Sequence, residues 1–289
     1  MQPPPYGGWQ QPPPPGGWQA PPPGGGGSGT EFLPPDDTEA KPANPNLTKA
    51  GLPIGMRGGL RLEIARVTSG RESYGYGTMD VLTQFPIAER VFFDGRLPMA
   101  FGNLGNPMIG VHGVSRPSER LWITVGGAFG LPLVGPDDEA AGSGSFAQAW
   151  WNSHHYAVDA IPLLLQLGLE GHAGDVALFR VELDPVLIMR TEPRGSEDAV
   201  DMGIQHAVEA QFGHTMGGGL RFQGVWLATA GRNDNYQLAV EPFFVVERES
   251  LFLRLGLLLP FNEPLDFIFD DSSGNAAWGV RAATGIHLD

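Results

Sequence analysis

The stretch "LFLRLGLLLP", residues 251–260, decides the fold class of this chain. In an extended strand successive side chains point to opposite faces, so one face carries only leucine, namely Leu251, Leu253, Leu255, Leu257 and Leu259. A helix would spread leucine around its whole circumference and place Arg254 among the leucines. The stretch therefore predicts a β-strand with one wholly aliphatic face.

The composition of the chain also favours strands and turns over helices. Its 289 residues include 42 Gly, 27 Pro and 16 Phe, and only 17% are charged, which is typical of an all-β protein. No apolar run approaches the roughly 18 residues that a transmembrane helix needs. The formal net charge of −14 disfavours phosphate binding, so we expect no nucleic acid partner. There is no cysteine, which excludes disulfides and thiolate metal sites.

Residues 1–50 are a separate region, in which "PPPYGGWQ" at 3–10 recurs as "PPPPGGWQ" at 12–19. A segment this rich in Pro and Gly cannot bury a core, so it predicts a disordered leader. The alternative is that Trp9 and Trp18 anchor the leader to cell-wall polymer or to a partner. The start of the chain lacks a charged region followed by an apolar one, and we expect a signal peptide to have been removed or to be missing from the sequence. Residues 51–289 form the folded domain.

The folded domain is a series of segments with alternating polarity. They predict twelve strands, over 56–68, 77–85, 91–101, 106–115, 120–133, 156–169, 176–190, 202–213, 217–229, 236–247, 251–259 and 276–288. After the first strand the connections alternate for most of the chain between a tight turn and a longer loop. With an even number of strands, all tight turns lie at one end, as in outer-membrane barrels. The pattern predicts a closed, antiparallel, up-and-down transmembrane β-barrel.

The two faces of these strands differ in a way that indicates which one meets lipid. One face is hydrocarbon, and besides the five leucines we expect Val280 and Ile286 to face lipid. The other face mixes acids with arginines and has no lysine, whereas a soluble β-sandwich would show Lys, Ser and Thr to water. We therefore expect eleven charged side chains to line the lumen: Arg61, Glu63, Asp94, Arg96, Arg180, Glu182, Glu209, Arg221, Glu241, Arg254 and Arg281.

Aromatic residues near the loop-side strand ends are typical of an interfacial girdle. The principal ones are Tyr76, Trp226, Tyr236 and Trp278, and the same pattern extends to Tyr74, Trp150, Trp151 and Tyr156.

The chain from about residue 56 to the end resembles bacterial outer-membrane β-barrels, and most closely the transporter-like barrels of the phenol meta-pathway family. The resemblance lies in "FGNLGNPMIGVHG" at 101–113 and "LWITVGGAFGLPLV" at 121–134. In that family a Gly-Asn/Asp-Pro turn opens a strand, and the next strand ends in a Gly-rich stretch closed by Leu-Pro. The resemblance implies a bacterial outer-membrane location, contact with outer-membrane lipid and lipopolysaccharide, and insertion by the barrel-assembly machinery. Such barrels often end in an aromatic residue, whereas this chain ends in "GIHLD".

No enzyme motif is present, and we expect neither a catalytic site nor a cofactor nor a metal. "GSGS" at 142–145 lacks the nucleophile-elbow pattern, and "DDSSGN" at 270–275 lacks EF-hand spacing. His154 and His155, with Asp137, Asp138 and Glu139 nearby in sequence, are the strongest candidates for chemistry, but a pair in a long loop is expected to be exposed and inert. His112, His206 and His287 each lie alone in a strand, and we expect them in the lumen or at the interface.

Three functions fit these observations. The first is a narrow channel or transporter for a small solute, because a twelve-stranded barrel has a narrower lumen than the 16- to 18-stranded porins. Mixed charges in the lumen would give it weak ion selectivity. The second is a structural or adhesive barrel with a plugged lumen. The third is a soluble β-domain that binds a ligand.

Overall fold

A computed structural model describes residues 58–69, 72–100, 103–135, 144, 148–174, 176–192, 200–213, 215–228, 235–248, 251–262 and 275–286. The chain divides into two units, Met1–Lys41 and Pro42–Asp289, and all described residues belong to the second. The predicted leader, with Trp9 and Trp18, lies outside the described residues. So do Asp137–Glu139, His287 and most of the two loop motifs at 142–145 and 270–275.

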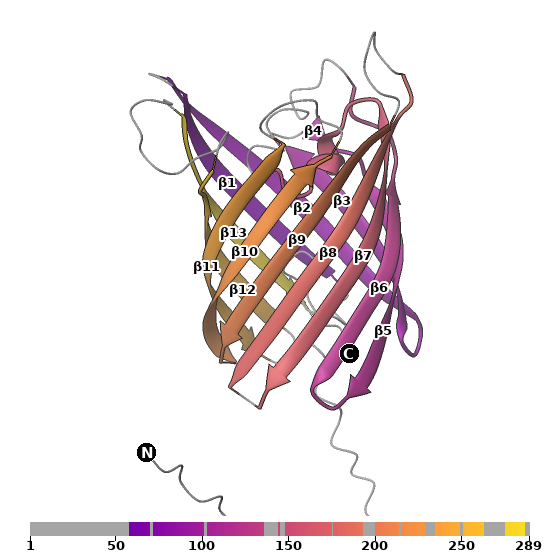
Figure 1. Ribbon diagram of the computed structural model, residues 1–289, viewed down its shortest axis with the longest axis vertical. Coiled ribbons are helices and arrows are strands. Elements are labelled where there is room, and N and C mark those ends of the chain that lie inside the picture. Colours follow the sequence, from indigo (N-terminus) through magenta and orange to yellow (C-terminus); the bar gives the residue numbers. More distant parts are fainter. Residues whose placement is uncertain are drawn as a thin grey trace, which may run out of the picture. The chain divides into compact units, whose positions relative to one another are not determined.

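The described residues form one sheet of thirteen strands (Figure 1). They are β1 (Gly58–Ser69), β2 (Glu72–Ala88), β3 (Val91–Ala100), β4 (Asn103–Leu104), β5 (Met108–Ser118), β6 (Leu121–Gly130), β7 (Ala160–Ala173), β8 (Ala177–Arg190), β9 (Val200–Phe212), β10 (Met216–Leu227), β11 (Tyr236–Arg248), β12 (Leu251–Pro260) and β13 (Asn275–Ile286). A short 3-10 helix, η1 (Ser153–Tyr156), lies between β6 and β7. No helix in the described part of the chain is long and apolar enough to cross a bilayer.

Twelve of these strands close into a barrel, as the alternating pattern predicts. Each pairs antiparallel with its neighbours, and the first and last strands pair from Gly58 opposite Ile286 to Ser69 opposite Asn275. The two-residue strand β4 pairs only with β3, and β3 pairs onward with β5, so β4 is an addition to the barrel and not one of its staves. Closure gives every stave two neighbours and leaves no open edge.

The connections alternate between the two ends of the barrel. Two-residue turns join β2 to β3 and β5 to β6 at the end that is lowest in Figure 1, while the longest connection, between β6 and β7, lies at the other end. Most boundaries differ from the prediction by one to four residues, and the largest difference is at β2, which begins at Glu72 instead of residue 77. Its pairing with β1 continues to Ser69 opposite Glu72, so the two strands extend as a hairpin beyond the predicted loop.

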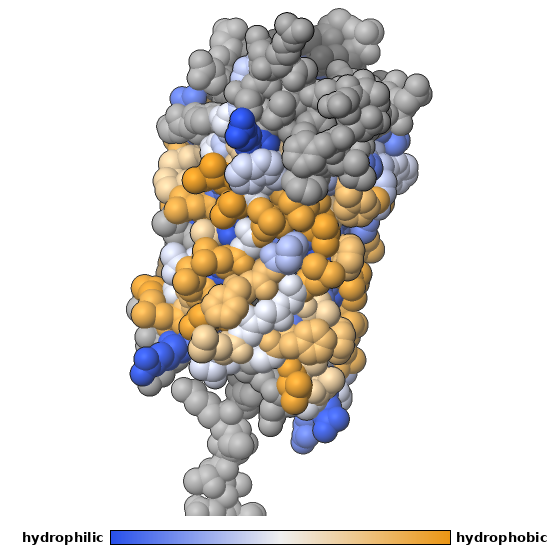
Figure 2. All heavy atoms as spheres, turned by 90° about the vertical axis from the view of Figure 1, so that its left-hand side faces the viewer, coloured by the Kyte–Doolittle hydropathy of each residue, from blue (hydrophilic) through white to orange (hydrophobic). Residues whose placement is uncertain are grey.

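The side-chain orientation is that of a membrane barrel. Leu251, Leu253, Leu255 and Leu257 are 39–56% exposed on the outside, and Leu259 is partly exposed, whereas Phe252 and Arg254 between them are buried. Val280 and Ile286 are also exposed. Figure 2 shows apolar side chains gathered in a broad band with hydrophilic ones toward its two ends. A soluble sandwich would bury its apolar face between two layers, so the soluble alternative is wrong for this fold.

Candidate functional site: the filled lumen

A single network of ionised side chains crosses the interior of the barrel, which we call the charged belt. It contains six arginines and six carboxylates from ten of the twelve staves: Arg61, Glu63, Asp80, Arg96, Glu170, Arg180, Glu182, Glu209, Arg221, Glu241, Arg254 and Arg281. Strands β5 and β6 contribute no member. Alternation places these residues inside because each follows the period-two pattern of its strand.

The belt is continuous because most of its members have two partners. Asp80 accepts from both Arg61 and Arg96, and Glu63 lies between Arg61 (3.3 Å) and Arg281. Arg281 continues to Glu241, which also accepts from Arg254 at 3.2 Å.

Glu209 is the branch point of the network. Its carboxylate is 2.9 Å from Arg254 and 3.6 Å from Arg221, and it also accepts from Arg180. Arg180 lies 2.7 Å from Glu170, and Arg221 lies 2.8 Å from Glu182. Three guanidinium groups therefore share one carboxylate.

The belt fills the lumen where it crosses. Eleven of the twelve residues are at most 5% exposed, and the Arg96 side chain is 12% exposed. Buried charges are tolerated only when paired and hydrogen-bonded, and a guanidinium fork can serve two carboxylates at once where a lysine cannot. This explains why every cation of the belt is arginine.

The connection between β6 and β7 folds into the barrel and lies on the loop side of the belt. We call residues 148–157 the inward segment. Gln148 Nε2 donates to Thr78 Oγ1 (3.3 Å), and Arg96 donates to Asn152 Oδ1 (3.3 Å). The Arg221 guanidinium lies 4.8 Å from the centre of the Trp151 ring, an arrangement that favours a cation–π interaction.

Apolar side chains pack the inward segment against the far wall. Trp151 contacts Ala207 and Val225, and Ala149 contacts Ala239 and Leu258. Together with the polar contacts, the segment contacts strands β2, β3, β9, β10, β11 and β12. It therefore spans the lumen from one wall to the other.

The Gly-Asn-Pro turn in the motif at 101–113 holds this segment in place. Asn106, fully buried, donates from Nδ2 to the carbonyl of Ala157 (2.8 Å), and its Oδ1 accepts from the backbone of Leu133 and Val134. Gly105 lies so close to the carbonyl of His155 that a Cβ would approach it to 2.7 Å. A larger residue than glycine would push the inward segment out of position.

The backbone of the inward segment is strained. Ala149, Trp150 and Asn152 have φ of 46°, 62° and 60°, and Asp159 just beyond it has 46°. The left-handed region costs a non-glycine residue about 1–2 kcal/mol, less for Asn and Asp. The segment is therefore held by its contacts with the wall and not by its own conformational preference.

The expectation that His154 and His155 are exposed is wrong. Both rings are 1% exposed inside the barrel, and Gln205 Nε2 donates to Nδ1 of His154 at 3.1 Å. Burial, with the positive charge of Arg96 beside the rings, lowers the pKa of His154 from 6.5 to about 3 and lowers the pKa of His155 well below 6.5. Both histidines are neutral at neutral pH. The sequence could not reveal this, because nothing in "SHHY" tells a loop that folds inward from one that projects outward.

Acid should therefore loosen the inward segment. Since the packed segment holds both histidines neutral, protonation below pH 6.5 favours its release, by up to about 1.4 kcal/mol per pH unit for each histidine until the folded-state pKa is reached. The groups that face the pair are Arg61, Asp80, Arg96 and Gln205. We expect the fluorescence of Trp150 and Trp151 to change between pH 6.5 and 4. A protein carrying both His154→Gln and His155→Gln should lose that change, and an unaltered response in it would show that other groups are responsible.

The part of the barrel wall formed by β5, β6 and β7 carries mainly small, uncharged residues on its inner face. Inward positions on β5, β6 and β7 include Gly110, Thr124, Gly126, Ala128 and Gly168. Gly126, Ala128 and Gly168 are partly accessible, whereas belt residues at corresponding positions on other staves are buried. Space not filled by side chains therefore lies along β6 and β7.

The structure places ten of the eleven predicted lumen residues in the belt. The other, Asp94, also faces inward but pairs with Nδ1 of His112 instead of an arginine. Two belt members were not predicted. Asp80 lies within the predicted strand 77–85 and has the same parity as Thr78, so the alternation already indicates that it faces inward. Glu170 lies just past the predicted end of its strand at 169, and the strand in fact continues to Ala173.

Some of the aromatic residues predicted for the interfacial girdle face outward, and others face the lumen. Trp226 and Trp278 are exposed on the outside, and Tyr236 lies beside them, its hydroxyl 2.8 Å from Nε2 of His206. The prediction that Tyr76 belongs to the girdle is wrong, because Tyr76 faces inward and packs against Trp150 and Ala277. The same prediction is wrong for Trp151 and Tyr156, since both are buried in the lumen. They belong to the inward segment and not to a girdle.

Among the described residues, no three His, Cys, Asp or Glu side chains are grouped so that they could hold a metal ion. Two histidines each pair with a single carboxylate, His112 with Asp94 and His172 with Glu170 at 2.6 Å.

Comparison with known proteins identifies the fold. No family model and no curated protein matches the sequence. An outer membrane channel from Pseudomonas putida F1 is similar in structure with a TM-score of 0.54 and 10% identity, over 85% of this chain and 98% of that one. The NanC porin gives 0.53 and 7%, over 79% and 100%. The fold of this chain, a closed antiparallel β-barrel of twelve strands, is similar to the folds of these two proteins.

Proposed function

We propose that this protein is an outer-membrane channel for a small solute, with no enzymatic activity, and that the inward segment is its gate. The observation that carries the proposal is that the segment is strained, crosses the lumen and is not part of the sheet. A barrel that served only as an anchor would not need a strained element of this kind, because the belt alone already packs most of the lumen below it.

The path that we propose runs along the neutral wall of β5, β6 and β7. The belt leaves β5 and β6 free and reaches β7 only at Glu170, and its six positive and six negative groups cancel, which supports weak ion selectivity. Movement of the inward segment would connect the space beside Gly168 with the loop side of the barrel. A small neutral solute fits such a passage better than an ion does.

Planar-bilayer conductance tests the gate. Asn106→Ala removes the bond from Asn106 Nδ2 to the Ala157 carbonyl of the segment and the two bonds that anchor Asn106 to Leu133 and Val134, and a loss of about 1–3 kcal/mol should raise the open probability about tenfold. Because the chain has no native cysteine, Thr78→Cys and Gln148→Cys can be joined by a short reducible thiol crosslinker that spans the reach of the glutamine side chain, and the locked protein should open only after reduction. If Asn106→Ala and a deletion of 148–157 both insert as folded barrels without conductance steps, the channel proposal fails and the plugged structural barrel replaces it.

Two matched glycine variants test the path. Gly168 faces the lumen and Gly127 faces outward, and a Cβ at either position would meet its nearest neighbour at about the same distance, 3.4 and 3.5 Å. In the Asn106→Ala background, Gly168→Leu should reduce single-channel conductance at least twofold, while Gly127→Leu should leave it unchanged. Equal conductance in both variants would place the path elsewhere in the barrel.

A further inference from the structure

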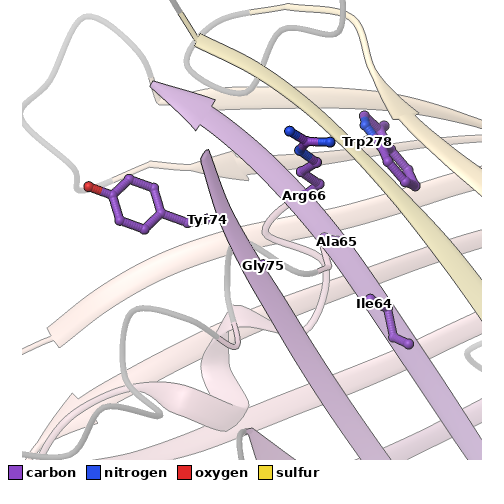
Figure 3. A pocket seen from close by; sticks show the side chains of 6 residues that line it. All are labelled: Ile64, Ala65, Arg66, Tyr74, Gly75 and Trp278. Carbon is purple, nitrogen blue, oxygen red and sulfur yellow. The ribbon is translucent and has the colours of Figure 1, made fainter. Parts of the chain in front are cut away.

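A cavity of about 340 Å³ opens on the outer face where the first and last strands of the barrel meet (Figure 3). Its lining comes from three adjacent strands: Ile64, Ala65 and Arg66 of β1, Tyr74 and Gly75 of β2, and Trp278 of β13. Figure 3 shows the Arg66 side chain between Tyr74 and Trp278, with Ile64 further along β1. The register agrees, since Arg66 stands opposite Gly75 on one side and Trp278 on the other.

The cavity is open because glycine replaces a side chain on the lipid face. A Cβ added at Gly75 would meet no atom within 4 Å, and one added at Gly77 would meet only the Glu63 carbonyl, at 3.9 Å. Gly77 stands opposite Ile64, which is 66% exposed. The two glycines therefore leave a groove that runs along Arg66 and Ile64 on the outside of the barrel.

Arg66 is unusual in its position. On outward-facing positions of the described strands, the charged side chains are Arg66, near the loop-side end of β1, and Arg248, at the turn-side end of β11. A charge on the lipid face is costly in the hydrocarbon and is tolerated near the interface, where it can reach headgroup phosphates. Trp278, which is exposed on the outside, places Arg66 at the level of the aromatic girdle, which marks that interface.

We propose that this groove binds one phosphorylated, multiply acylated lipid of the outer leaflet, a lipid of the lipid A type. The forked guanidinium of Arg66 would hold a phosphate with two hydrogen bonds. Trp278 would pack against the sugar, and an acyl chain would follow Ile64 and Leu62, both exposed on the same face of β1. The proposal rests on the membrane location of the proposed function but not on conduction, so a barrel without conductance can still bind the lipid here.

The test measures lipid binding to the full-length protein in nonionic detergent, by native mass spectrometry. The probes are bisphosphorylated lipid A and the same lipid with both phosphates removed. Arg66→Gln should weaken binding of the phosphorylated probe about tenfold and leave the dephosphorylated probe unaffected. Arg248→Gln, which removes the other outward arginine, should change neither. Gly75→Leu should fill the groove and weaken both probes.

Three results would overturn the proposal. The first is equal binding of phosphorylated lipid A to Arg66→Gln and to the unaltered protein. The second is equal binding of the two probes to the unaltered protein. The third is displacement of the lipid by an equal concentration of inorganic phosphate, which would indicate a site for free anions. Heat-modifiable migration in gels verifies that each variant is folded, and Arg66→Lys, which keeps the charge but not the fork, should retain part of the affinity.

Discussion

Replacing Glu209 by Gln is expected to lower the free energy of unfolding by about 3–5 kcal/mol, the usual cost of removing one partner from a buried ion pair. The substitution keeps the shape of the side chain and removes only its charge. Arg180, Arg221 and Arg254 would each lose one of two carboxylate partners. The partners that remain are Glu170, Glu182 and Glu241, respectively. A guanidinium deprived of a partner in the closed lumen cannot turn to water, since Arg221 is only 2% exposed.

Urea titration of the protein in lipid vesicles, followed by tryptophan fluorescence, measures this loss. The matched control is Glu89→Gln. Glu89 pairs with Arg90 at 3.8 Å in a turn where both side chains are largely exposed, and a pair of that kind contributes little. We expect no measurable change in the control. A Glu209→Gln protein as stable as the control would mean that water enters the lumen and screens the belt.

Replacing Leu255 by Arg is expected to cost about 2–4 kcal/mol, because the residue lies near the middle of β12 and faces the lipid. Leu251→Arg provides the control, since it introduces the same side chain on the same face of the same strand, at its turn-side end. Near the interface the cost falls to about 0–1 kcal/mol.

The difference between the two leucine variants depends on depth alone. Folding into vesicles under urea gives both free energies from one protocol. Equal costs at residues 251 and 255 would contradict the placement of β12 across the hydrocarbon. A cost in detergent as large as that in vesicles would point instead to damaged packing between β12 and β13, where Leu255 stands opposite Ala282.

The barrel could be predicted from the sequence because its two faces meet such different environments. The leucines of 251–259 and the inward-facing arginines follow the same two-residue alternation. A shift of one residue would move every one of these side chains to the opposite face of the sheet. The same rule places most of the belt. It fails at Glu170, which lies beyond the predicted end of its strand, and at Tyr76, which has the inward parity of Thr78 and Asp80 but lies before the predicted start of its strand at residue 77.

The inward segment could not be predicted because its position depends on contacts with distant strands. Trp151 packs on Ala207 and Val225, more than fifty residues later, and Asn106 binds it from more than forty residues earlier. The two-residue alternation within a strand carries no information about such contacts. In the sequence, the Gly-Asn-Pro motif indicates only a family resemblance. In the structure, Gly105 and Asn106 contact the inward segment, and the motif holds that segment in place.

The pairing of Gly58 with Ile286 has a consequence for how the protein is made. Strand β13 is also the neighbour of β1, so the nascent sheet carries two unpaired edges until β13 has been synthesised. Those edges invite pairing with other chains, and the long sequence separation slows the final docking step. Assembly should therefore be post-translational and dependent on chaperones that shield both edges.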